Sequence, residues 1–134
     1  TAAVLTALLT ALVLYLMTPR TEIRSLTGFR CYFVPHCEVN YQSYHRDNDL
    51  YNMGIYKLNG QDAARFVYWA QENGWSKMPL SDEALTSGML DEETCPEAAE
   101  IKQVTQGFWK GFYGVYLYVF DSQTATLYIR KMPR

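Results

Sequence analysis

The sequence predicts an α+β protein, in which an N-terminal transmembrane helix is followed by a small, mostly antiparallel sheet packed by one main helix. Three patterns predict it: an uncharged apolar run over residues 2–17, a helical pattern over 59–75, and alternating segments over 115–131. Aromatic residues make up 15% of the chain, which indicates that the part after the run is folded. The expected parts are a transmembrane anchor at 1–18, a juxtamembrane linker at 19–28 and a soluble α+β domain at 29–134.

The first segment, "TAAVLTALLTALVLYLMTPR", carries no side-chain charge before Arg20. A membrane span usually needs about 20 apolar residues, so this run lies at the short limit. Large residues stand near Met17, where a signal-cleavage site needs small ones, and this favours an uncleaved anchor over a removed signal. We expect a single-pass cell membrane protein with its domain outside the cytoplasm, although Arg20 and Arg24 alone favour the opposite orientation.

Small residues recur along one side of the anchor. They are Ala3, Thr6, Ala7, Thr10 and Ala11. Such stripes let transmembrane helices approach one another closely, so one interpretation is a helix–helix contact in the membrane. The alternative is that Ala and Thr are simply common in apolar anchors, and the lack of glycine favours it.

Aromatic and alternating segments predict the strands of the domain's first half. They are expected at 29–34, at about 39–44 and at 50–58, with a turn at 46–49 between the last two. In the third of these, alternation places Tyr51, Met53 and Ile55 on one face.

The clearest helix covers "NGQDAARFVYWAQENGW", residues 59–75. Asn59 or Gly60 can cap its start, and Gly74 followed by Trp75 is the pattern of a Schellman motif at its end. The stripe expected to pack on the sheet is Ala63, Phe66, Val67 and Ala70. Two short helices are expected after Ser81 and Pro96.

The final segment predicts a hairpin around "SQT". Val115, Leu117 and Val119 form an apolar set, and we expect this set to face the main helix. The other face is then aromatic and is either a partner surface or covered by a second layer. With the glycine-spaced aromatics of "GFWKGFYG", the candidate partner-binding residues are Trp109, Phe112, Tyr116, Tyr118, Phe120 and Tyr128. We expect a ligand or partner groove at this entry to the hairpin.

Thiols and imidazoles gather before residue 50, at Cys31, His36, Cys37 and His45. Their spacing matches no closed zinc motif and no nucleophilic signature, so we predict no metal site, no cofactor and no catalytic residue. The preferred interpretation of the cysteines is buried, reduced thiols. A Cys31–Cys37 bridge is the alternative and would require Pro35 to break the strand.

The net charge of −2 and the sparse basic residues argue against nucleic-acid binding. Residues 82–100 hold seven acidic side chains and no basic one. We interpret this stretch as a solvated loop with acids at helix starts, with a cation or docking site as the alternative.

From residue 50 onward the chain resembles small uncharacterised exported or membrane-anchored proteins of Gram-positive bacteria. The resemblance rests on "NGWSKMPLS" and on "GFWKGFYGVYLYVFDSQTATLYIRKM", with its D-x-x-T-x-T-L-Y turn. It implies an envelope location and an α+β domain, and it implies no activity.

Two hypotheses follow. The first is a non-catalytic, membrane-anchored protein-binding module, such as an accessory subunit or an immunity-type inhibitor, whose partner meets the aromatic hairpin face or the small-residue stripe. The second is an envelope enzyme or metal-binding protein that uses the region of Cys31, His36, Cys37 and His45.

Overall fold

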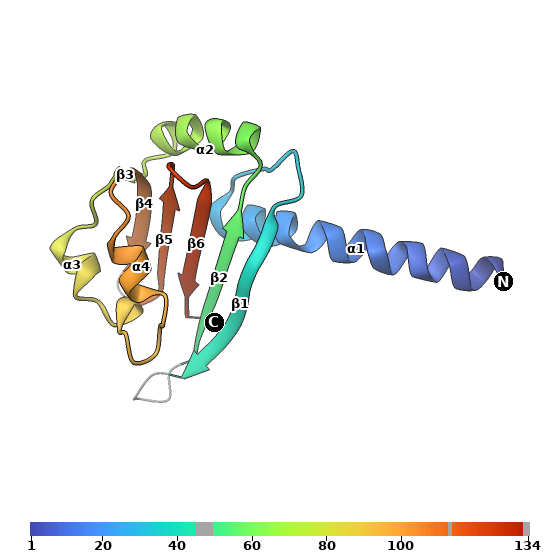
Figure 1. The fold of residues 1–134 in the computed structure, drawn as a ribbon, viewed down its shortest axis with the longest axis horizontal. Helices are drawn as coiled ribbons and strands as arrows, with labels where there is room; N and C mark the ends of the chain where they lie inside the picture. The colour runs from blue at the N-terminus through green and yellow to red at the C-terminus, as the bar shows by residue number, and fades with distance from the viewer. Residues whose placement is uncertain (45–49, 113, 133–134) are drawn as a thin grey trace.

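A computed structural model describes residues 1–44, 50–112 and 114–132. Its six strands form one antiparallel sheet in the order β1-β2-β6-β5-β4-β3, and the apolar helix α1 projects from the domain (Figure 1). The strands are β1 (His36–Tyr44), β2 (Leu50–Lys57), β3 (Ser76–Lys77), β4 (Gly107–Phe112), β5 (Tyr116–Asp121) and β6 (Thr126–Lys131). The helices are α1 (Ala2–Thr27), α2 (Gly60–Glu72), α3 (Asp82–Leu85), α4 (Ala98–Lys102) and the 3-10 turn η1 (Gly88–Leu90). The predicted α+β class, antiparallel sheet and N-terminal apolar helix are confirmed.

Helix α1 is longer than the predicted anchor. Residues 19–27, expected as a linker, continue the helix, and Gly28 ends it with a φ of 87° and an N–H that donates to the Arg24 carbonyl. The cause is packing, because Ile23 is fully buried in the domain core and Leu26 packs against that core. One helix therefore belongs to the apolar segment at its start and to the folded domain at its end.

The segment between α1 and β1 is not the strand predicted at 29–34. Its Tyr32 and Phe33 amides donate to the carboxylate of Asp62 in α2, and the ladder with β2 begins only at His36. The strands expected at 39–44 and 50–58 are present as parts of β1 and β2. The turn predicted at 46–49 lies outside the described residues.

Local signals place α2 where the sequence predicts it. The Asn59 side chain accepts from the Gln61 amide at 2.9 Å and caps the start. At the end, Gly74 has a φ of 76° and the Trp75 amide donates to the Ala70 carbonyl at 3.1 Å, which is the long hydrogen bond of a Schellman motif.

Both faces of the sheet are covered. Helix α2 and the end of α1 contribute to the core on one face, and the segment from Leu80 to Val104, with its short helices, covers the other. The larger members of the first core are Ile23, Phe29, Tyr56, Phe66, Tyr118, Phe120, Leu127 and Ile129. The larger members of the second are Tyr51, Met53, Ile55, Met89, Leu90, Ile101, Leu117, Val119 and Tyr128.

The faces of the hairpin are the reverse of the prediction. Leu117 and Val119 pack in the second core, away from α2, while the Phe120 ring lies 4.4 Å from that of Phe66 in α2. The register pairs Tyr128 with Val119, so Tyr128 does not share a face with Tyr118. Both faces of the hairpin are buried. The contrast between aliphatic and aromatic residues therefore does not indicate which face packs against α2.

Strand β4 approaches β5 so closely at Gly107 that only glycine fits there, and a substitution tests this. Its φ is +135°, and a Cβ there would lie 1.8 Å from the Phe120 carbonyl oxygen. We expect Gly107→Ala to lower the free energy of unfolding by about 3 kcal/mol or more, measured by urea titration of the full chain in mild detergent. Gly60→Ala is the matched control, since a Cβ at Gly60 meets nothing within 4 Å. Equal stability of the two variants would contradict this account.

Candidate functional site

An apolar cleft lies at the entry to the hairpin, where the sequence predicts a groove. Its volume is about 160 Å³. Three of the predicted partner-binding residues line it: Trp109, Phe112 and Tyr116. Ala84, Met89 and Leu117 complete much of its apolar wall.

The same cleft borders a free strand edge. Strand β3 pairs with β4 only at Phe108 and Trp109, so within the described residues the outer edge of 110–112 has no strand partner. The Phe112 side chain is 62% exposed. An unpaired edge beside an apolar cleft is the geometry at which an extended peptide adds to a sheet.

The other three predicted partner-binding residues are buried. Tyr118 stacks against Tyr116 and Trp75, Phe120 packs on Phe66, and the Tyr128 hydroxyl donates to Glu100 at 2.8 Å on the opposite face. For these three residues the structure shows the alternative, a covered face, and only Trp109, Phe112 and Tyr116 line the cleft.

Among the described residues, no cysteine thiol forms a hydrogen bond with a histidine, although His36 and Cys37 line the same cleft. Cys37 Sγ contacts the Val39 carbonyl at 3.6 Å, and His36 is an exposed neighbour. Burial raises the pKa of Cys31, Cys37 and Cys95, whereas a nucleophilic thiol requires a lowered pKa. All three cysteines are free, and the described residues contain no cluster of three potential metal ligands. His45 lies outside the described residues.

The small-residue stripe lies on the exposed part of α1. Thr6 and Thr10 each donate a hydroxyl hydrogen bond to the carbonyl four residues earlier, so their polar groups are satisfied within the helix. The stripe packs against no other described element, and its role in a helix contact stays a prediction.

Two acidic residues of the 82–100 stretch accept hydrogen bonds from tyrosines of the sheet. Glu97 accepts from the Tyr41 hydroxyl at 2.5 Å, and Glu100 accepts from Tyr128. Asp82 lies in the first turn of α3, whose start is capped by Ser81. These contacts fit the interpretation of acids at helix starts and add tyrosine partners that the sequence did not indicate.

Arg130 in β6 is a buried cation that sequence reasoning missed. It is 1% exposed, and its guanidinium donates to the Met89 and Thr94 carbonyls and to the Ser43 hydroxyl at 3.2–3.3 Å. It thereby fastens the segment of short helices to the sheet. In the alternating pattern it looks like an outward polar residue, because the sequence does not show that a second layer covers that face.

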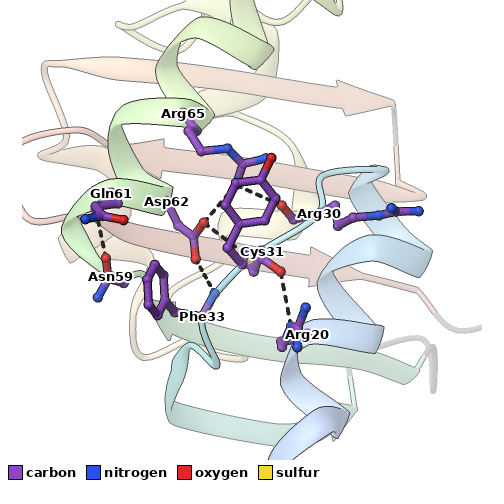
Figure 2. Close-up of polar contacts among 9 residues, drawn as sticks. Arg20, Arg30, Cys31, Phe33, Asn59, Gln61, Asp62 and Arg65 are labelled. Carbon is purple, nitrogen blue, oxygen red and sulfur yellow. Dashed lines mark hydrogen bonds and ion pairs between the residues drawn. The ribbon is translucent and has the colours of Figure 1, made fainter.

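Asp62 makes the second buried charged site, at the junction of α1 and the domain (Figure 2). Its carboxylate is fully buried and accepts from the Tyr32 and Phe33 amides at 3.0 and 2.9 Å and from Arg65 at 2.8 Å. The Arg65 guanidinium lies 3.5 Å from the centre of the Tyr32 ring. From sequence, an acid in the first turn of a helix indicates only a favourable dipole, so this clamp could not be recognised.

Comparison with known proteins identifies no family for this fold. No protein-family model, curated protein or solved structure matches the chain. The fold and sites define an α+β domain with a six-stranded antiparallel sheet, an edge cleft and an apolar N-terminal helix. The resemblance to Gram-positive exported proteins stays a prediction.

We expect Asp62→Asn to lower the free energy of unfolding by about 2–4 kcal/mol, because the change leaves buried amides and Arg65 with a poorer partner. Hydrogen exchange at the Tyr32 and Phe33 amides should accelerate. Glu72→Gln is the control: it removes the same charge from an exposed position of α2 and should change stability by about 0.5 kcal/mol or less. Unchanged exchange at both amides would contradict the assignment of the clamp.

Alkaline pH should weaken the fold through Cys31. Burial and the Asp62 carboxylate raise the pKa of this thiol from 9.0 to about 11. Arg20 and Arg65 lower the pKa, but their effect is smaller. The folded state thus favours the neutral thiol, and this contribution is full below pH 9 and is lost as the pH rises through 11. We expect Cys31→Ala to show a shallower loss of unfolding free energy between pH 9 and 11 than the wild type. Parallel profiles would show that Cys31 does not contribute.

Proposed function

We propose that this protein is a non-catalytic, membrane-anchored protein-binding module of the cell envelope, of the kind that serves as an accessory subunit or immunity-type inhibitor. The proposal combines an anchor, α1, with a docking site, the cleft at the edge of β4. The cleft is the observation that carries it.

The anchoring part rests on the exposed surface of α1. This is the one helix in the described part of the chain that is long and apolar enough to cross a membrane, although a signal sequence meets the same test. Leu5, Leu8 and Leu9 are each 62% exposed. Exposing these apolar side chains to water costs free energy, and burial in a bilayer removes that cost. Moreover, the helix continues from this surface to the buried Ile23, so cleavage near Met17 would interrupt a helix that the core holds.

The docking part rests on backbone and side-chain features together. Residues 110–112 of β4 form an outer edge that no described strand covers, and Trp109, Phe112 and Tyr116 offer apolar area with little side-chain entropy to lose. The occupant that fits is an extended apolar segment of a partner protein, which adds as a strand beside β4 and inserts alternate side chains into the cleft. We place the domain outside the cytoplasm, as expected for a short amino-terminal anchor before a Tyr-rich domain.

The enzyme alternative receives no support from the thiols. A catalytic cysteine needs a lowered pKa and an adjacent base, and Cys37 has a raised pKa and a backbone partner.

Photo-crosslinking tests the docking site. The photoreactive residue p-benzoylphenylalanine replaces Phe112 in the full chain, and membranes of the producing organism are irradiated. We expect a discrete adduct of higher mass, identified by mass spectrometry, and its loss when Trp109→Ala is added in the same chain. The matched control carries the same photoreactive residue at Tyr68, which is 69% exposed on α2 and does not line the cleft.

Three outcomes would count against the proposal. An adduct of equal yield from the Tyr68 position would show that the contact is unspecific. If the Phe112 position gives no adduct, the proposed docking site is refuted. If alkaline carbonate releases the wild-type chain from membranes, the proposed role of α1 as an anchor is refuted.

A further inference from the structure

Three arginines line a second cleft, between the end of α1 and the connection that follows it. It is lined by Arg20, Thr21, Arg24, Arg30 and Cys31, and its volume is about 240 Å³. Arg20 and Arg24 are one helical turn apart. Arg20 Nε donates to the Cys31 carbonyl at 3.1 Å, which fixes the connection against the helix (Figure 2).

Two of the three arginines of this cleft are exposed. Neither Arg24 nor Arg30 forms an ion pair with a described residue. Asp62, the buried acid near Cys31, is already held by Arg65 and two backbone amides. Arg30 extends away from Asp62 in Figure 2. The cleft therefore concentrates positive charge in a chain whose net charge is −2.

The cleft also lies where α1 leaves the domain. Residues 2–14 of α1 are exposed and Ile23 is buried, so Arg20 stands at the change from the projecting part to the packed part. The connection to β1 lies on the side from which α1 projects (Figure 1). It carries three exposed apolar side chains directly after Cys31, namely Tyr32, Phe33 and Val34, at 63%, 44% and 44% exposure. Aromatic residues of this kind are typical of the level of lipid headgroups.

We propose that the cleft of Arg20, Arg24 and Arg30 binds the phosphate of an anionic phospholipid. Guanidinium groups bind phosphate oxygens through paired N–H donors, and a basic juxtamembrane segment is attracted to an anionic leaflet. Tyr32, the exposed aromatic residue next to Cys31, contacts the glycerol region of the same lipid, which distinguishes a lipid from free phosphate. This inference rests on the proposed anchoring by α1, and it adds a headgroup contact that fixes the domain's orientation on the bilayer.

The test uses the full chain in mild detergent with equimolar phosphatidylglycerol and phosphatidylcholine, and native mass spectrometry measures the ratio of the bound lipids. We expect the wild type to retain phosphatidylglycerol at least about 5-fold over phosphatidylcholine, and Arg24→Gln/Arg30→Gln to lower this ratio to about 1. Neither side chain donates a hydrogen bond to another described residue, so the double variant should fold. Lys57→Gln/Lys77→Gln removes the same charge from exposed positions of β2 and β3 and should keep the wild-type ratio.

Each outcome supports or overturns the inference. A double variant that keeps the wild-type ratio overturns the site, and so does a control that loses it. Displacement of the lipid by millimolar inorganic phosphate shows a site for free anions and overturns the assignment to lipid. Carbonate extraction of the same variants separates this test from the proposed anchoring. Chains that resist extraction but show no lipid preference refute only the headgroup site, whereas chains released by carbonate refute the anchor.

Discussion

The buried carboxylate of Asp62 is the interaction on which the arrangement of α1 and the sheet depends. The connection between them has no ladder partner until His36, so its backbone amides need another acceptor. Asp62 supplies it from the start of α2, and Arg65 balances its charge. A carboxylate without these donors would cost several kcal/mol to bury, so the connection and the carboxylate hold each other in place.

This clamp helps to hold the last turns of α1 against the domain. Ile23 packs in the same core as Phe29 and Phe66, and the Arg20–Cys31 hydrogen bond ties the helix to the clamped connection. The part of α1 after Pro19 is therefore fixed relative to the sheet.

Sequence patterns were sufficient where the signals are local. The cap at Asn59 and the Gly74–Trp75 ending of α2 depend on residues within one or two turns, and both are present as predicted. The groove at the hairpin entry was also found, because Trp109 and Phe112 lie close in sequence around Gly111. The strand predicted at 29–34 failed because its amides are taken by an acid about 30 residues away. The hairpin's faces and the buried Arg130 could not be predicted, since nothing in a single alternating strand indicates that both faces are covered.

The two clefts are lined by different parts of the fold, and this limits what each can bind. The arginine cleft is lined by the end of α1 and by residues 30–31 before β1, whereas the aromatic cleft borders β4, the fourth strand across the sheet from β1. At about 4.8 Å per strand, β4 stands roughly 19 Å from β1. A headgroup contact at the first cleft would leave the β4 edge clear of the lipid surface. Under the two proposals together, the docking segment would be a water-exposed part of the partner protein and not its membrane-spanning part, since an extended strand in lipid would leave its outer backbone groups unpaired.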